Sequence, residues 1–455
     1  MSSEVLNFAQ VLPRKAAIQC LQWNPAHAPL VNSRLTRHIY SRRETGKITL
    51  SASASHSSPP ASAGSTFVSP FARLAALLEG VQPGASAINL SIGEPRHAQP
   101  AFVGPTLAAN LAGFGKYPPI KGSDEFRASV AGWLGRRYGL GSAVDPATMV
   151  VALNGSREGL FYAALEARRS SRKQVADPVI LIPNPFYPVY AAGALAAGCT
   201  PVMMPADAAT GFLPVVEAIP ADVLHRAVAC FFASPANPQG AVASLEGWRS
   251  LIRLAREHDF LLFADECYSE IYRAEPPAGV LEAAASLGAG FGHVVSFNSL
   301  SKRSNLPGLR CGFAAGDPDF LTRWSVFRNI AAPQVPLPAQ AVAVAAYADE
   351  AHVEDNRLQY NAKFAIAEEL LGPLFGPVTP PGGFFLWLDV AAHGGGEAVA
   401  ARLWREAGLR VIPGAYLATA DTEGCNPGAP FIRIALVESL DLTREAMQRL
   451  ARILA

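Results

Sequence analysis

Apolar and polar positions follow two alternating patterns along residues 111–335. Residues 122–140 place apolar side chains at the spacing of one helical face: Phe126, Val130, Trp133, Leu134 and Tyr138. Ser123 stands directly before them, where an N-cap is expected. This pattern predicts an amphipathic helix that packs one side against a core.

Short apolar runs that end in turn residues make up the second pattern. They lie at 148–155, 178–185, 200–206, 227–238, 260–266, 293–299 and 309–317. Their length and their lack of polar alternation predict strands buried on both faces. Helix-length segments such as 157–169 and 245–259 lie between them, so the pattern predicts an α/β fold with a mainly parallel sheet flanked by helices.

The pattern changes again after residue 335. Residues 336–372 have a helical pattern, and 382–390 and 430–437 resemble strands. We therefore expect a large domain over 111–335, and a smaller α/β domain formed by 67–110 together with 336–455.

Polar residues interrupt the ends of the apolar runs. They are Asn154, Gly155, Ser156, Arg157, Asn184, Asn237, Asp265, Tyr268, Ser299 and Lys302. Parallel strands end at one edge of a sheet, where ligands of such folds bind. An acid, amides, a phenol, hydroxyls and an amine at that edge predict a binding site.

Composition narrows the class of ligand. A formal net charge of +1 and 16% charged residues argue against a nucleic-acid partner. The sequence contains no uninterrupted run of about 18 apolar residues, which is the length that predicts a membrane span. The six cysteines form no C-x-x-C pair, so neither a metal site nor a disulfide framework is indicated. We expect a small-molecule ligand.

Residues 1–66 differ from the rest of the chain. They hold seven basic and only two acidic residues, and serines are dense from Ser51 to Ser65. This composition is typical of an organellar transit peptide followed by a linker. We expect a plastid (chloroplast stroma) protein with a disordered extension at 1–66; a mitochondrial or cytoplasmic location is the alternative.

Lys302 is the first candidate for chemistry. It follows an apolar strand, where partial burial would lower its pKa and free the amine to attack carbonyls. Pyridoxal phosphate (PLP), the carbonyl cofactor of such lysines, needs a carboxylate at its ring nitrogen and donors at its ring oxygen. Asp265 can supply the first, and Asn237 and Tyr268 the second.

The sequence also offers candidates for binding the phosphate of PLP and for stacking on its ring. Gly155 and Ser156 lie between a strand and a helix, where backbone N–H groups can bind a phosphate. Ser299 and Arg310 flank Lys302 and could bind the same phosphate. Tyr187 could lie flat on the cofactor ring.

A competing motif uses the same lysine. Residues 299–302, SLSK, satisfy the S-x-x-K signature of serine acylases. Those enzymes also need S-D-N and K-T-G boxes, which this chain does not contain. The chain also has no H-E-x-x-H, Walker A or G-x-G-x-x-G motif.

Six separated motifs together resemble the class I/II aminotransferases of PLP fold type I. They are NLSIGEP, KYPPIKGSDEFR, NGSREGL, SPANPQG, FADECYSEIY and SLSKRSNLPGLRCGF, and the resemblance runs from about residue 67 to the C-terminus. NGSREGLF, NPFYPVY and SLSKRSNLPG look most like the N-succinyldiaminopimelate aminotransferases of lysine biosynthesis.

The resemblance implies a role for each matching residue. Lys302 would bind PLP covalently and move the proton, while Asp265, Asn237, Tyr268 and Tyr187 hold the ring. The phosphate would be bound by the backbone of Gly155, Ser156 and Arg157 together with Ser299 and Arg310. The side-chain role of Arg157 is open, since much of the family has a small hydroxyl residue there.

Three further residues gain roles from the resemblance. Tyr117 would reach the phosphate of a neighbouring subunit's cofactor, which implies a homodimer with shared sites. Arg433 would bind the substrate α-carboxylate, with help from Gly93 and Asn237.

The implied activity is transamination between an amino acid and 2-oxoglutarate, with N-succinyl-LL-2,6-diaminopimelate as the expected donor. Other aminotransferases of the class, acting on aspartate, alanine or aromatic donors, are alternatives. So are a PLP-dependent carbon–sulfur lyase on the same fold and a non-catalytic PLP-binding relative.

Overall fold

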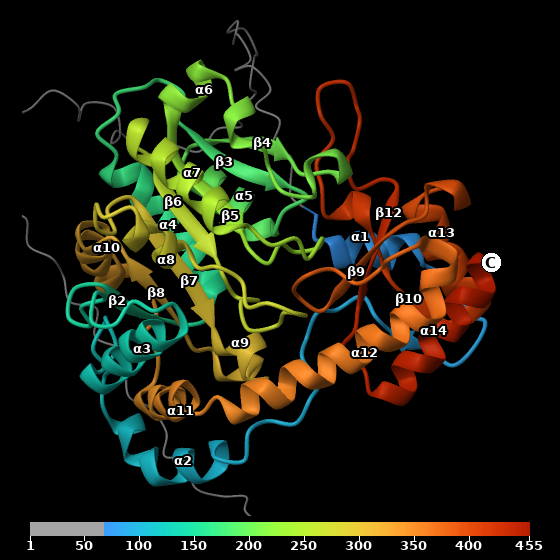
Figure 1. The fold of residues 1–455 in the computed structure, drawn as a ribbon, viewed down its shortest axis with the longest axis horizontal. Helices are drawn as coiled ribbons and strands as arrows, with labels where there is room; N and C mark the ends of the chain where they lie inside the picture. Colours follow the sequence, from blue (N-terminus) through green and yellow to red (C-terminus); the bar gives the residue numbers. More distant parts are fainter. Residues whose placement is uncertain (1–67) are drawn as a thin grey trace, which may run out of the picture. The chain divides into compact units, whose positions relative to one another are not determined.

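The structure is a computed structural model that describes residues 68–455 (Figure 1). The extension predicted at 1–66 lies outside the described residues. Within 68–455, no helix is long and apolar enough to cross a membrane.

A seven-stranded sheet forms the centre of the larger part. Its strand order is β2 (Val150–Leu153), β8 (Gly312–Gly316), β7 (Val294–Ser299), β6 (Leu261–Asp265), β5 (Ala227–Ala233), β3 (Val179–Asn184) and β4 (Thr200–Pro205). Each predicted apolar run contains one of these strands, which confirms the prediction. All seven strands are fully or partly buried except at the ends of β4, as expected of a sheet covered on both faces.

One strand departs from parallel pairing. β8 pairs antiparallel with both β2 and β7, while the other pairs are parallel. Gly312 of β8 pairs with Leu153 on one side and Ser299 on the other. Residues just before β8 therefore lie at the same sheet edge as residues just after β2 and β7.

Helices cover both faces of this sheet (Figure 1). On one face lie α3 (Asp124–Arg137), α7 (Leu245–Glu257) and α8 (Val280–Ser286), and on the other α4 (Ser156–Ser170), α5 (Pro188–Ala196) and α10 (Pro318–Ala331). The side chain of Ser123 caps α3 by accepting from the Phe126 N–H at 3.2 Å. The five apolar residues predicted for this helix face are all buried.

The second group of elements surrounds a smaller core. β9 (Phe385–Asp389), β12 (Phe431–Ala435) and β11 (Ile412–Pro413) pair antiparallel, and β1 (Ile88–Asn89) pairs with β10 (Leu409–Arg410). α12 (Ala351–Phe375), α13 (Gly396–Ala407) and α14 (Leu440–Leu454) pack with them. The strands predicted within 382–390 and 430–437 are confirmed.

The helical pattern at 336–372 corresponds to two helices. α11 (Leu337–Ala348) ends before Asp349, and α12 begins at Ala351. Side chains of α11 and of α2 (Val103–Asn110) join the core of the seven-stranded sheet, while α12 packs in the smaller core. The domain boundaries at 110 and 335 stay predictions.

Candidate active site

Lys302 lies in the short helix α9 (Leu300–Arg303), directly after β7. Ser299 begins this helix, and its Oγ accepts from the Ser301 N–H at 3.1 Å. The ammonium of Lys302 donates to the carbonyl oxygen of Gly93 at 2.5 Å. Burial lowers the pKa of Lys302 to about 8, and the positive charges of Arg433 and Arg157 act in the same direction. A pKa this low makes the neutral, nucleophilic amine accessible in mildly alkaline solution.

Asp265 is the last residue of β6 and is buried. Its Oδ2 accepts from the Tyr190 hydroxyl at 2.6 Å, and its Oδ1 from the Cys267 N–H at 3.3 Å. Burial raises the pKa of Asp265, while these hydrogen bonds and the charge of Lys302 oppose the rise. Asp265 and Lys302 thus act on each other electrostatically, and a protonated ring nitrogen near Asp265 would stabilise its ionised form.

Tyr190 is a site residue that the sequence analysis missed. It lies on α5, is fully buried, and stacks on Phe231 with ring centroids 4.7 Å apart. The available signal was its spacing, since it follows Tyr187, the residue directly before α5, by three positions in the first turn of that helix. Cys267 was also missed; its pKa is raised by burial and by the charge of Asp265, and it contacts Ser156.

We expect Tyr190→Phe to weaken the hold on Asp265 without unfolding the protein. The ring and its stacking stay, but one donor to the carboxylate is lost, which is worth about 1.5–3 kcal/mol for a charged partner. Activity should fall about tenfold or more. Steady-state kinetics and the dissociation constant of PLP measure the effect, with Tyr162→Phe as a matched control because the Tyr162 hydroxyl donates to the Ala331 carbonyl instead. Equal effects in the two variants would contradict the role of Tyr190.

The turn after β2 forms a cradle at the same sheet edge. Gly155 precedes α4 with φ +80°, and a Cβ there would lie 2.2 Å from a guanidinium nitrogen of Arg310. Arg310, just before β8, donates to the Asn154 carbonyl at 3.2 Å. Backbone N–H groups at a helix start and a partly open guanidinium suit a phosphate dianion. This arrangement depends on the antiparallel course of β8.

Tyr187 and Arg157 face each other at this edge. The guanidinium of Arg157 donates to the Tyr187 hydroxyl and lies 5.6 Å from its ring centroid. Tyr187 also meets Tyr190 edge to face at 5.7 Å. The predicted stacking of Tyr187 on a cofactor ring stays a prediction.

Arg433 lies in the middle of β12 and is buried. Its guanidinium donates to the Asn237 side-chain oxygen at 3.2 Å and to the Ser91 carbonyl at 2.8 Å, while its Nε has no hydrogen-bond partner within residues 68–455. Burial lowers the pKa of Arg433 to about 10, so the side chain stays charged at neutral pH. Among the residues that the structure describes, no carboxylate pairs with this buried cation, which suits an incoming carboxylate.

Tyr268 and Gly93 lie close to the ammonium of Lys302. The Tyr268 ring meets Phe384 at 5.2 Å and lies 6.0 Å from the Lys302 nitrogen. A Cβ on Gly93 would lie 2.6 Å from the Phe385 ring, so only glycine fits there. Tyr117, in contrast, is 98% exposed.

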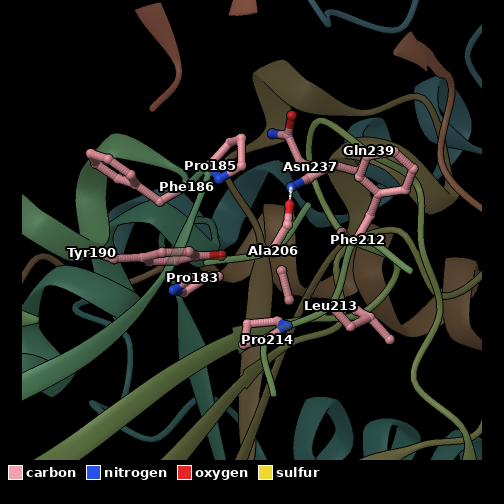
Figure 2. Close-up of a pocket in the computed structure, with 12 residues that line it drawn as sticks. Pro183, Pro185, Phe186, Tyr190, Ala206, Phe212, Leu213, Pro214, Asn237 and Gln239 are labelled. Atoms are coloured by element: carbon pink, nitrogen blue, oxygen red, sulfur yellow. Dashed lines mark hydrogen bonds between the residues drawn. The ribbon is translucent and has the colours of Figure 1, made fainter. Parts of the chain in front are cut away.

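Tyr190 and Asn237 also line a neighbouring pocket (Figure 2). The rest of its lining is mainly apolar, including Phe212 and Leu213. A phosphate would find no cation among its lining residues, so the cradle at Gly155 is the better phosphate site. Within residues 68–455, no three metal-binding side chains gather closely enough to hold an ion.

A lysine and a carboxylate that interact at the edge of a mainly parallel sheet, beside a phosphate cradle, define a PLP-dependent enzyme of fold type I. The chain belongs to the class I and II aminotransferases, whose family model matches residues 85–453. This family uses PLP, and the α/β fold and the class predicted from the motifs are confirmed.

Individual relatives agree with this assignment. The chain is 33% identical over 378 residues to an LL-diaminopimelate aminotransferase of Syntrophobacter fumaroxidans, covering 81% of this chain and 92% of that protein. An aminotransferase structure from Neisseria meningitidis matches with a TM-score of 0.81 and 37% identity, over 85% of this chain and 98% of that one. A probable N-succinyldiaminopimelate aminotransferase from Thermus thermophilus matches with a TM-score of 0.73 and 26% identity, over 85% and 100%.

Proposed function

We propose that this aminotransferase moves the amino group of a diaminopimelate-type donor to 2-oxoglutarate. The observation that carries the proposal is the buried guanidinium of Arg433, which lies within electrostatic range of Lys302 and is bonded to Asn237. A fork of donors fixed there would hold the α-carboxylate of either substrate, amino acid or 2-oxo acid.

The chain's residues divide the work of the reaction. Bound PLP would supply the electron sink for the amino-acid α-carbon. Asp265, held by Tyr190 and the Cys267 N–H, would keep the ring nitrogen protonated. Arg433 would orient the α-carbon. Lys302 would remove the proton from the α-carbon and donate it back as the amino group is transferred.

Arg157 provides a positive charge for an acidic group at the far end of the donor. Arg157 is exposed at the mouth of the site, and its charge reaches Lys302. The relatives named for diaminopimelate and for its N-succinyl form both act on donors with a distal carboxylate. We assign Arg157 to this carboxylate, in addition to the backbone role expected at the phosphate.

A donor screen tests the proposal. The PLP-loaded enzyme would be assayed with 2-oxoglutarate and, in turn, LL-diaminopimelate, its N-succinyl form, aspartate, alanine and phenylalanine. Glutamate should form fastest from one of the first two, and Arg157→Gln should reduce kcat/KM for these donors but not for alanine. A preference for alanine or phenylalanine would contradict the proposal. Pyruvate and ammonia released from cystathionine without an acceptor would favour a carbon–sulfur lyase.

We further propose that the enzyme works as a homodimer. Three exposed apolar or aromatic side chains, Leu111, Phe114 and Tyr117, lie on or beside η1 (Leu111–Gly115), and a second copy would bury them. Light scattering should give twice the chain mass of 48.0 kDa. A monomer with full activity would contradict shared sites.

The acid-poor composition of residues 1–66 supports a plastid location. A fluorescent fusion of residues 1–66, imaged in plant cells, tests it. Accumulation in chloroplasts is the expected result, and a mitochondrial or cytosolic signal would overturn it.

A further inference from the structure

Behind Lys302 lies a buried hydrogen-bond chain of three side chains: His97, Asn356 and Lys363. It has no part in the chemistry described so far. His97 Nδ1 lies 2.7 Å from the side-chain oxygen of Asn356, and His97 Nε2 lies 2.7 Å from the ammonium of Lys363. Asn356 and Lys363 belong to α12 and are 2% and 1% exposed. Polar groups so deeply buried are costly unless their bonds are satisfied, so this arrangement needs a physical reason.

The hydrogen bonds determine the state of the histidine. The amide nitrogen of Asn356 donates to the carbonyls of Lys302, at 3.1 Å, and Arg303, at 3.4 Å. Because carbonyls only accept, the oxygen of Asn356 must face His97 and accept from its Nδ1–H. Nε2 then carries the lone pair, which accepts from Lys363. The chain is complete only with a neutral His97 protonated on Nδ1.

This hydrogen-bond chain contacts Lys302 at its backbone, on a second side from the bond of its ammonium. Gly93 and His97 lie four residues apart on one segment. The Gly93 carbonyl accepts from the Lys302 ammonium, and His97 reaches the Lys302 backbone carbonyl through Asn356. The segment 93–97 therefore contacts both ends of the catalytic lysine.

We propose that His97 is a positioning residue for transamination, which in its neutral form holds the segment 93–97 against the turn of Lys302. Lys363 keeps His97 in that form. The inference rests on the proposed role of Lys302.

The groups around His97 make this arrangement sensitive to pH. Burial lowers the pKa of His97, the bond to Asn356 opposes this, and the charge of Lys363 lowers the pKa further. Burial lowers the pKa of Lys363 to about 8, against the attraction of Glu438, which pairs with Arg96. The Tyr360 ring packs against His97 at 4.4 Å and carries no charge near neutral pH.

A second proton on His97 would break the chain. It would place an N–H on Nε2 facing the N–H groups of Lys363, and two donors cannot share that contact. A folded-state pKa below the ordinary value means that the neutral form is kept until the pH falls through that lowered pKa. Positioning of Lys302 is therefore lost on the acid side, and kcat falls there while KM changes little.

Three variants of the full-length, PLP-loaded enzyme test the inference. His97→Phe keeps a ring on Tyr360 but loses both hydrogen bonds, and should lower kcat about tenfold to hundredfold, the cost of a small misplacement of a reacting group. His97→Asn keeps a donor for Asn356 without a titrating ring, and should retain most of kcat while losing the acid limb. Lys363→Met removes the donor that a second proton on His97 would face, and should weaken or remove the acid limb.

The measurements are the pH profile of kcat and the pH titration of the visible absorption of bound PLP, which reports on Lys302 without turnover. Melting temperatures exclude unfolded variants. His293→Asn is the control, because His293 pairs with Asp259 at 3.0 Å at the start of β7, the end away from Lys302. It should leave both profiles unchanged.

Two results would overturn the inference: an acid limb unchanged in Lys363→Met, or an equal loss in His97→Phe and His97→Asn with an unchanged absorption titration. If His97→Phe does not fold, the pH profile of kcat in Lys363→Met tests the inference by itself. Failure of the proposed function would look different, because the wild-type enzyme would then prefer alanine or phenylalanine as donor while both pH profiles kept their predicted changes. Failure of the role of Lys302 would leave the absorption of bound PLP in Lys302→Ala.

Discussion

Replacing Lys302 with alanine is expected to abolish transamination and the visible absorption that PLP acquires when bound to a lysine. The amine of Lys302 is the nucleophile and the proton carrier proposed for the reaction, and its low pKa of about 8 suits both tasks. Loss of a positioned acid–base group alone costs about 10²–10⁴-fold in rate. Loss of the covalent link to PLP adds to this, so activity should be undetectable in a coupled glutamate assay.

Lys173 provides a matched control for this experiment. It is a half-buried lysine whose ammonium also donates to a carbonyl, that of Ala227 at 2.5 Å, and burial also lowers its pKa. Lys173→Ala should keep the absorption and most of the activity. If Lys302→Ala kept its absorption, or if Lys173→Ala lost it, the assignment of Lys302 would be wrong.

Replacing Arg433 with alanine is expected to raise KM severely for amino acids and 2-oxo acids alike. Arg433 is 5% exposed, so an α-carboxylate bound to its guanidinium would be largely removed from water. Removing one partner of a buried ion pair costs about 3–5 kcal/mol, which corresponds to two to four powers of ten in kcat/KM at about 1.4 kcal/mol per factor of ten.

The affinity for PLP separates this role from a structural one. Among the predicted PLP-binding side chains described by the structure, only Asn237 accepts a hydrogen bond from Arg433. PLP should therefore stay bound in Arg433→Ala, as measured by absorption after desalting. Arg433→Lys keeps the charge but loses the fork, so it should recover only part of the affinity. Parallel loss of PLP and of substrate binding would instead indicate a structural role.

The local pattern was sufficient for the strands and for naming candidate site residues. Seven apolar runs became the seven strands of the large sheet because each is short, buried and bounded by turn residues. Asp265 and Lys302 could be found because a charged residue at the end of a buried strand has few purely structural explanations. Their meeting followed from the rule that parallel strands end at one edge.

Direction and pairing were beyond the local pattern. Nothing within residues 309–317 shows that β8 runs opposite to its neighbours, yet this brings Arg310 to Gly155. Tyr190 resembles an ordinary core aromatic until its hydroxyl is seen on Asp265. His97 and Lys363 are separated by more than half the described chain, and neither belongs to a motif that predicts their contact.

The sequence by itself determined the α/β class, the family and the chemical groups of the site, because periodicity and motif residues act over a few neighbouring positions. Only the tertiary structure decided how those groups are held: Tyr190 on Asp265, Arg310 against Gly155, and His97 between Asn356 and Lys363. The physical reason is that hydrogen bonds and charge interactions depend on distance in space, and the chain path that sets those distances results from packing the whole core.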